Sequence, residues 1–311
     1  MKGNFTFYNP TKIYVGANSI KNLKSELDNY GSNVLLAYGG GSIKKNGIYD
    51  TVVDILAKAN KNVFEFSNIM PNPTLTKLLE GKRLCEENHI DLILAIGGGS
   101  VIDCAKGVSA SAYKDNPWES FWLNNEECTN SIPVGTILTM VGTGSEMNGG
   151  SVITNEETHK KKGHVFGPNV FPKFSILDPT YTFTVSRYQM CSGIFDIFSH
   201  LMEQYFSGDD DNTSDYLIEG LMRSLINSTK VALKDQTDYE ARSNIMWTST
   251  LALNTLVGKG KEQDWEVHSI EHQISAYTNC SHGMGLAAIS PSYYRHIYKY
   301  GLGKFYPASM V

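Results

Sequence analysis

The sequence has few cysteines, and their spacing does not indicate a disulfide framework. The five cysteines are an odd number and include no Cys-x-x-Cys pair, which indicates a reducing compartment. The amino-terminal MKGNFTFYNPTK lacks an apolar stretch long enough for a signal peptide, and no window approaches the length of a membrane span. We therefore expect a cytoplasmic protein with no membrane partner.

An excess of charge of either sign is also absent. The chain has 27 Lys and Arg against 32 Asp and Glu, a net charge of -5 at pH 7 and a pI near 5.9. These values argue against a nucleic-acid partner or an anionic membrane surface. The densest basic run, Lys160-Lys161-Lys162, is short and more typical of a solvated turn than of a binding patch.

Two common site motifs are missing. Without G-x-G-x-x-G, a standard dinucleotide-binding fold would be wrong in detail. Without H-E-x-x-H, a zinc protease is disfavoured. What the chain does have is the 311 residues and 41% hydrophobic content of a globular enzyme, enough for two domains.

Short apolar runs alternate with helical patterns up to about residue 180. The expected strands are 34–38, 62–66, 92–96, 132–140, 151–154 and 174–178, with a hairpin or edge strand within 5–15. The expected helices between them are 17–30, one running through Val52 to Ala57, 75–88 and 101–113. Strands alternating with helices predict a mostly parallel sheet covered on both faces.

After Asp178-Pro179 the character changes to helices alone. Five are expected, over 187–206, 213–234, 239–257, 264–278 and 284–299. We therefore predict a dinucleotide-binding α/β domain over residues 1–180 and an all-helical metal-binding domain over 181–311.

Two GGGS turns, at 39–42 and 97–100, each follow an apolar strand and precede a helix. Glycine lets the backbone approach a phosphate closely, and a helix N-terminus offers free N–H groups at the positive end of its dipole. Either turn alone is equally well explained by the need for glycine in a tight turn. Two in consecutive strand–helix units, with a third turn at 142–145, favour phosphate binding.

The second turn opens the more specific stretch GGGSVIDCAK. Ser100 is placed to cap the helix, and Asp103 lies in its first turn. The Asp103 carboxylate could simply interact with the helix N-terminus. The functional alternative is a carboxylate that faces the nicotinamide amide or ribose.

Two pairs of metal-ligand side chains have the i, i+4 spacing of a helix face. Asp196 and His200 lie in GIFDIFSH, and His268 and His272 lie in WEVHSIEHQISAYTNCSH, which also holds His282. A lone pair of this kind is more often a surface ion pair. One carboxylate and several imidazoles on two helices can instead meet around one divalent cation, Fe(II) or Zn(II). The spacing leaves open whether His268 or His272 is the ligand.

Longer motifs carry a family resemblance: FYNPTKIYVG, YGGGSIKKNG, MPNPT, AIGGGSVIDCAK, TGSEMNGGSVIT, LDPTYT, DIFSHLMEQYF and HSIEHQISAYTNCSHGMGLA. Through them residues 1–300 resemble the iron-containing (group III) alcohol dehydrogenases, in particular the NADPH-dependent butanol dehydrogenase branch. The resemblance implies a dehydroquinate synthase-like fold, with a Rossmann-like α/β domain and an all-α domain. It also implies a metal and a dinucleotide in the cleft between them, and a homodimer.

The resemblance also implies the site residues. Those for the cofactor are Gly39, Gly40 and Ser42 at the adenosine ribose, Asn72 along the cofactor, Gly98, Gly99 and Ser100 at the pyrophosphate with Asp103 nearby, and Thr139, Thr143, Asn148 and Lys161 on the nicotinamide side. Those for the metal are Asp196, His200, His268 and His282. His272, one turn further on, is the catalytic candidate for carrying protons between the alcohol and solvent, or else it orients a ligand.

The first turn bears on the choice of cofactor. NAD-specific relatives place an Asp just after the strand, where this chain has Gly39, while Ser42, Lys44 and Lys45 provide donors for a 2′-phosphate. We therefore expect NADP(H). The expected reaction interconverts small primary alcohols and aldehydes of the butanol/butyraldehyde type, with the metal as Lewis acid and hydride carried by the nicotinamide.

Relatives continue for several more helices, whereas this chain stops at Val311, so we expect a shortened carboxy-terminal part. Two alternative functions would also use this fold. A dehydroquinate-synthase-like lyase would need several basic residues around the metal, and the neighbourhood of His272 shows none. A catalytically weak or assembly-only relative would be expected to have lost a ligand, yet all four ligand positions are filled.

Overall fold

The computed structural model describes residues 3–208, 212–301 and 303–305, which form two compact units. One unit comprises Pro10–Met140 and Ser145–Thr184. The other comprises the described residues of Met1–Asn9, Val141–Gly144 and Val185–Val311. In these described ranges, none of the helices is long and apolar enough to cross a membrane.

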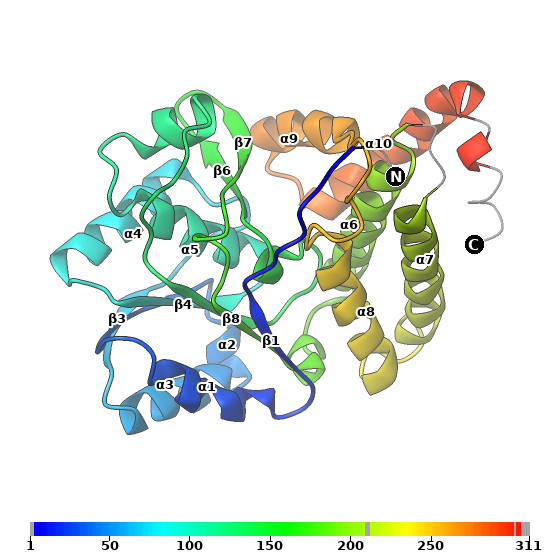
Figure 1. Cartoon of the computed structure of the whole chain (residues 1–311). Helices are drawn as coiled ribbons and strands as arrows, with labels where there is room; N and C mark the ends of the chain where they lie inside the picture. The colour runs from blue at the N-terminus through cyan, green and yellow to red at the C-terminus, as the bar shows by residue number, and fades with distance from the viewer. Residues whose placement is uncertain (1–2, 209–211, 302, 306–311) are drawn as a thin grey trace. The chain divides into compact units, whose positions relative to one another are not determined.

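The first unit is built on six parallel strands in the order β1-β8-β5-β4-β2-β3 (Figure 1). Their bounds are Lys12–Val15 (β1), Asn33–Tyr38 (β2), Asn62–Phe66 (β3), Leu92–Gly97 (β4), Val134–Leu138 (β5) and Phe174–Leu177 (β8). The central strands β2, β4 and β5 are almost entirely buried. A parallel strand covered on both faces reads as a continuous apolar run, which is the pattern of VLLAY and LILAI.

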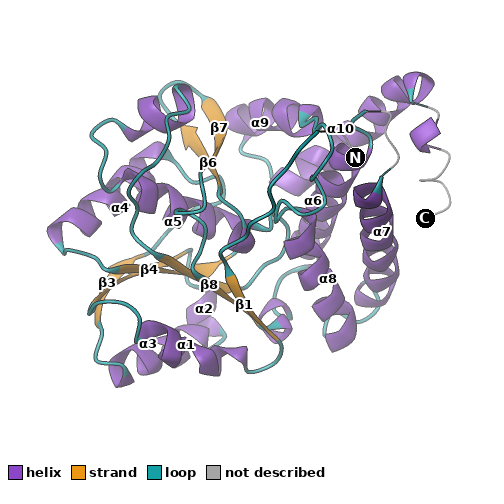
Figure 2. Ribbon diagram, in the orientation of Figure 1, coloured by secondary structure: helices purple, strands orange, loops and turns teal. Residues whose placement is uncertain are grey.

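Helices cover both faces of this sheet, with α1, α2 and α3 on one side and α4 and α5 on the other (Figure 2). Their bounds are Leu23–Leu27 (α1), Ser42–Lys45 (α2), Ile48–Lys58 (α3), Leu75–Glu87 (α4) and Gly99–Ser111 (α5). On the first side, Leu27 and Leu56 belong to one buried apolar cluster with Leu36 and Leu94 of the sheet. The predicted α/β architecture with a parallel sheet is confirmed.

The remaining two strands form a separate antiparallel hairpin, β6 (Gly150–Asn155) and β7 (Lys160–Val165). The prediction of a solvated turn at Lys160–Lys162 is therefore wrong. Lys161 lies in β7 and is buried, and its ammonium donates to Asn72 Oδ1 at 2.9 Å. The strand predicted over 151–154 exists, but it pairs with β7 and not with the main sheet.

Several predicted helix limits are also corrected. The helix expected over 17–30 is a 3-10 turn followed by the short α1. The single helix expected after the first GGGS turn is broken into α2 and α3 at Gly47, whose φ of 80° interrupts the helix. Ser100 does not cap α5, which begins at Gly99 with Gly98 at the N-cap. Within 5–15 there is no hairpin, only the edge strand β1.

The second unit is helical, as predicted for the carboxy-terminal part. Its helices are α6 (Arg187–Tyr205), α7 (Thr213–Ala232), α8 (Tyr239–Ala252), α9 (Glu266–Thr278) and α10 (His282–Ile297). Helix α6 packs against α7, α8 and α10, and α10 also packs against α9. A Cβ on Gly283 would lie 1.9 Å from Ser192 O, and one on Gly193 would lie 2.2 Å from Val141 O. Glycine is therefore required where these backbones meet.

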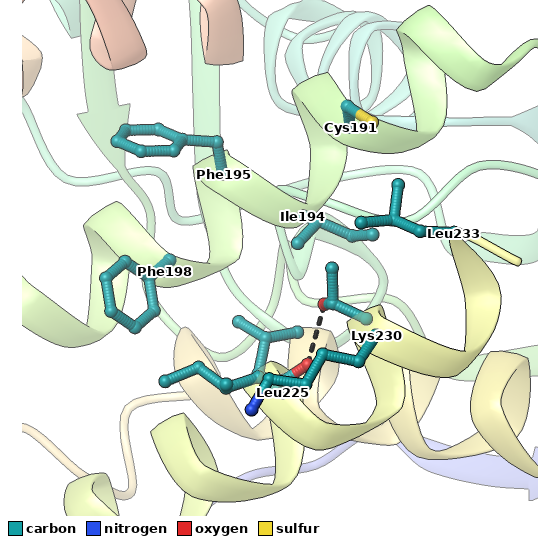
Figure 3. A pocket seen from close by; sticks show the side chains of 9 residues that line it. Cys191, Ile194, Phe195, Phe198, Leu225, Lys230 and Leu233 are labelled. Carbon is teal, nitrogen blue, oxygen red and sulfur yellow. Dashed lines mark hydrogen bonds between the residues drawn. The ribbon is translucent and has the colours of Figure 1, made fainter. Parts of the chain in front are cut away.

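An apolar groove of about 360 Å³ lies between α6 and α7 (Figure 3). It is lined by Cys191, Ile194, Phe195, Phe198, Leu225, Ile226, Thr229, Lys230 and Leu233. Successive helical residues are about 100° apart, so the groove residues of α6 lie on the opposite side of that helix from Asp196 and His200. The groove therefore does not contain the predicted metal ligands.

Candidate metal centre and nucleotide site

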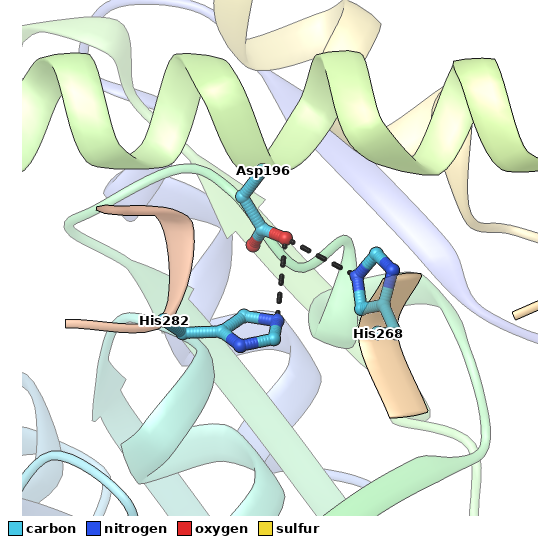
Figure 4. A group of neighbouring side chains, drawn as sticks. All are labelled: Asp196, His268 and His282. Carbon is cyan, nitrogen blue, oxygen red and sulfur yellow. Dashed lines mark ion pairs between the residues drawn. The ribbon is translucent and has the colours of Figure 1, made fainter. Parts of the chain in front are cut away.

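The four predicted metal ligands converge on one oxygen in the helical unit. Asp196 Oδ1 lies 3.5 Å from His200 Nε2, 3.6 Å from His268 Nε2 and 3.5 Å from His282 Nε2. Figure 4 shows Asp196 on α6 with His268 and His282 turned towards it from two other segments. The ligand atoms of these three residues all lie within 4.8 Å of one another.

Local structure explains how each ligand reaches this point. Asp196 and His200 are one turn apart on the same face of α6. His268 lies in the first turn of α9, and His282 is the first residue of α10. Ser281 at the α10 N-cap contacts Ser192 of α6 through their hydroxyl groups, 2.8 Å apart. The close packing of α10 on α6 thus determines where His282 lies.

The electrostatics of the cluster favour positive charge at its centre. Burial alone would raise the pKa of the Asp196 carboxyl, but the neighbouring His200 and His282 rings hold it well below its usual range. Burial lowers the pKa of His200 to about 3, so this ring is neutral. Burial opposes the charge on His268 too, yet the carboxylates of Asp196 and Glu203 raise its pKa to about 9.

The residues fit a divalent metal. Asp196 Oδ1 and His268 Nε2 are buried and have no hydrogen-bond partner among the described residues, although they face each other across 3.6 Å. A buried polar atom without a partner is costly, and a shared cation would satisfy both atoms. One carboxylate oxygen and three imidazole nitrogens make a donor set that Fe(II) and Zn(II) accept.

His272 lies beside this centre. It is half-buried on α9, and its ring centroid is 6.3 Å from that of His268 and 5.5 Å from that of His282. Glu271, His272 and His282 also form a second group with metal-like spacing. Glu271 is, however, already bonded to His282 Nδ1. The structure thus brings His272 next to the four ligands.

The two GGGS turns lie side by side in the α/β unit. Strands β2 and β4 are paired in parallel, with Tyr38 opposite Ile96, so Gly39, Gly40 and Ser42 follow one carboxyl end and Gly98 to Ser100 follow the next. The chain leaves β2 towards β3 on one side and leaves β4 towards β5 on the other. Such a switch point is where open α/β sheets bind ligands. Thr139 follows β5, the next strand along the same edge.

The Asp103 carboxylate accepts hydrogen bonds from residues after β5 in the α/β unit. One carboxylate oxygen accepts from Ser145 Oγ and the other from Val152 N at 3.0 Å. Asn148 is also buried, and its Oδ1 accepts from Gly150 N and from Lys106 Nζ, each at 2.9 Å. The structure therefore brings these two predicted cofactor residues into one network that joins α5 to the turn before β6.

The remaining predicted cofactor residues lie in two further places. Asn72, which has a φ of 55°, and Lys161 contact each other directly, so the 70–74 loop and the β7 strand form one surface in the α/β unit. Thr143 belongs to Val141–Gly144, a segment of the helical unit. There, Gly142 N donates to Ser249 Oγ at 3.0 Å, and a Cβ on Gly142 would lie 3.1 Å from Asp196 Oδ2.

Sequence reasoning missed three residues of these networks. Lys106 is fully buried and donates to Ser145 O and Asn148 O, at 2.9 and 3.1 Å. Glu203 bonds His268 Nδ1, and Glu271 bonds His282 Nδ1. The available signal was a repeated His-x-x-Glu, since His200-Leu201-Met202-Glu203 and His268-Ser269-Ile270-Glu271 share it.

Two family models match this chain. The iron-containing alcohol dehydrogenase model matches residues 10–179. The model of the Fe-containing alcohol dehydrogenase family, C-terminal, matches residues 190–309. Together they include every residue of the two candidate sites described above.

Individual proteins and a crystal structure are also similar to this chain. The chain is 44% identical to NADH-dependent butanol dehydrogenase A of Clostridium acetobutylicum, over 94% of this chain and 75% of that protein. It is 38% identical to NADPH-dependent aldehyde reductase YqhD of Escherichia coli, over 93% of this chain and 75% of that protein. The crystal structure of NADH-dependent butanol dehydrogenase A from Thermotoga maritima matches with a TM-score of 0.94 and 39% identity, over 97% of this chain and 76% of that one.

Proposed function

Because the chain belongs to the iron-containing alcohol dehydrogenase family, and is thus a metal-dependent alcohol/aldehyde oxidoreductase with a nicotinamide cofactor, we propose a narrower activity for it. It interconverts small primary alcohols and aldehydes of the butanol/butyraldehyde type with NADP(H). The relatives named for butanol and for aldehyde reduction support this substrate class.

The observation that carries the proposal is the convergence of three imidazole nitrogens on Asp196 Oδ1, at 3.5 to 3.6 Å, in a buried site. Asp196, His200, His268 and His282 would hold Fe(II) or Zn(II). When bound, the metal supplies Lewis-acid polarisation of a carbonyl oxygen, and the nicotinamide supplies the hydride.

The chain's own residues would bind, orient and move a proton. Asp196 supplies the anionic donor, and the buried neutral ring of His200 supplies a nitrogen that needs no deprotonation. His272, half-buried beside His268 and His282, is the residue we assign to proton transfer with solvent.

The preference for NADP(H) rests on the first GGGS turn. A Cβ on Gly39 would lie 3.2 Å from Ile69 O, so an acidic side chain there would be crowded as well as repelled by a 2′-phosphate. Ser42, Lys44 and Lys45 are all exposed, and Lys44 Nζ lies 4.4 Å from the centroid of the Tyr49 ring. The named relatives include both NADH- and NADPH-dependent enzymes, so this preference needs its own measurement.

The test is NADPH oxidation with butyraldehyde after the protein has been loaded with Fe(II) or Zn(II). We expect turnover in the wild type, a near-complete loss in His268→Ala, and wild-type rates in His296→Ala, a control at an exposed histidine. The absence of aldehyde-dependent turnover in the metal-loaded wild type would overturn the proposed substrate class. Equal kcat/KM values for NADH and NADPH would overturn the cofactor preference. The proposed homodimer is checked separately by light scattering.

A further inference from the structure

The two helices that carry most of the metal ligands share a local arrangement. On α6, Glu203 follows the ligand His200 by three residues, and on α9, Glu271 follows the ligand His268 by three residues. Residues three apart lie on one helix face, so each glutamate is directed to the same side as its histidine. Both glutamate side chains are buried, with exposed fractions of 2% and 0%.

Glu203 makes contacts that reach across to α9. Its Oε1 bonds His268 Nδ1 and accepts from Ser199 Oγ at 3.1 Å. Its Oε2 accepts from the backbone N–H groups of Val267 and His268, at 3.0 and 3.3 Å. These are first-turn donors of α9, whose N-cap residue Trp265 makes no side-chain cap. Glu203 therefore caps α9 from another helix and holds the ring of its ligand histidine.

Glu271 repeats the arrangement one helix further on. It lies on α9, and its Oε2 bonds the Nδ1 of His282, the first residue of α10. A Cβ on Gly285 would lie 2.9 Å from Glu271 Oε1, so glycine at this position of α10 leaves room for the carboxylate. The ring of His282 is thus held by a side chain that comes from a neighbouring helix.

These contacts determine which ring nitrogen faces the metal site. A carboxylate accepts hydrogen bonds and does not donate them, so Nδ1 of each bonded histidine carries the hydrogen. When a metal displaces the second proton of such a ring, the lone pair that binds it is on Nε2, the atom that lies 3.6 Å (His268) and 3.5 Å (His282) from Asp196 Oδ1. We propose that Glu203 and Glu271 are positioning residues, each holding a ligand histidine of another helix in the tautomer and orientation that a divalent metal requires.

This inference rests on the metal site of the proposed function, and its test measures metal binding directly. Zn(II) affinity is determined by competition with a chromophoric chelator for the wild type, Glu203→Gln, Glu271→Gln and the exposed control Glu240→Gln. We expect about 10- to 100-fold weaker binding in the first two variants and no change in the control. The visible spectrum of the Co(II)-loaded protein should also shift in both variants, because the ligand rings are released from their orientation.

The possible outcomes separate the two claims. A wild type that does not bind Zn(II) would overturn the metal site and the positioning role with it. Tight binding by the wild type, with both variants within threefold of it, would overturn the positioning role alone. A purely structural role would lower the thermal midpoint of the metal-free protein without changing the affinity. Glu271→Gln leaves the α9 cap intact, so it keeps the test decisive if Glu203→Gln does not fold.

Discussion

Two buried polar clusters, one around Lys106 in the α/β unit and one around Asp196 in the helical unit, differ in how their polar atoms are satisfied. In the α/β unit, Lys106 Nζ has three oxygen partners within 3.1 Å, and Asp103 accepts from Ser145 and Val152. In the helical unit, Asp196 Oδ1 and His268 Nε2 face each other with no partner among the described residues. The first cluster is satisfied within the chain and stabilises the fold. The second requires a ligand from outside.

The largest expected effect is on Zn(II) affinity, which should depend on the cluster around Asp196 and not on the cluster around Lys106. Asp196→Asn removes the anionic oxygen on which three imidazoles converge, so we expect Zn(II) affinity to fall by more than about 100-fold, beyond what the loss of an outer partner costs. The metal-free protein should also lose stability, because the neighbouring imidazole rings hold the pKa of the Asp196 carboxyl well below its usual range and that favourable interaction is removed. Chelator competition and urea unfolding measure the two quantities. Retained affinity would mean that Asp196 is not a ligand.

A substitution in the cluster around Lys106 should instead change stability and leave metal binding unaffected. Lys106→Met leaves Asp103 buried without its cation, 3.8 Å away, and removes the ammonium donor from three oxygens. We expect a loss of about 3–5 kcal/mol in the free energy of unfolding. Zn(II) affinity should be unchanged, because Lys106 is in the other unit. A loss below about 1 kcal/mol in urea unfolding would contradict the stabilising role.

A milder substitution tests whether Ser145 and Lys106 stabilise the Asp103 carboxylate together. Ser145→Ala removes one donor from this carboxylate but leaves the bond from Val152 N. Hydrogen bonds to charged groups are worth more than neutral ones, so we expect about 1–2 kcal/mol of destabilisation, less than for Lys106→Met. Thermal unfolding of the two variants and their double mutant measures this. Additive losses would show that the two contacts are independent, against the single network described here.

The last expected effect is a trend with pH. Burial lowers the pKa of Lys106 from 10.5 to about 8, although Asp103 and Glu146 oppose the shift. The unfolded chain therefore binds more protons between pH 8 and 10.5, and the wild type should gain stability relative to Lys106→Met across that window. The slope should not exceed about 1.4 kcal/mol per pH unit, and below pH 8 the difference should be flat. A difference that instead narrows above pH 8 would show that Lys106 is stabilised in its charged form.

The strands that could be predicted from the sequence are those whose hydrophobic pattern follows directly from the burial of their own residues. Strands β2 and β4 are continuous apolar runs because both faces are covered. Strand β7 could not be predicted this way, because KKKGHV is charged and its buried Lys161 depends on Asn72, 89 residues away. Similarly, the break at Gly47 depends on a backbone angle that composition does not reveal.

The same distinction applies to the site. Asp196 and His200 are one turn apart on a single helix, so their spacing is visible in the sequence. The partners of the other histidines come from different helices, and Glu203 is 65 residues from His268. Which side chain holds a ring is decided by how helices pack, and a spacing rule does not contain that information.

The glycines at 193 and 283 have a consequence for engineering. With a Cβ on Gly283 only 1.9 Å from Ser192 O, and one on Gly193 only 2.2 Å from Val141 O, neither position has space for a side chain. A library that varies residues around the metal to admit bulkier alcohols should therefore keep both glycines. A substitution at Gly283 would move the start of α10, and with it His282, and one at Gly193 would displace the backbone of Val141, before either altered the substrate range.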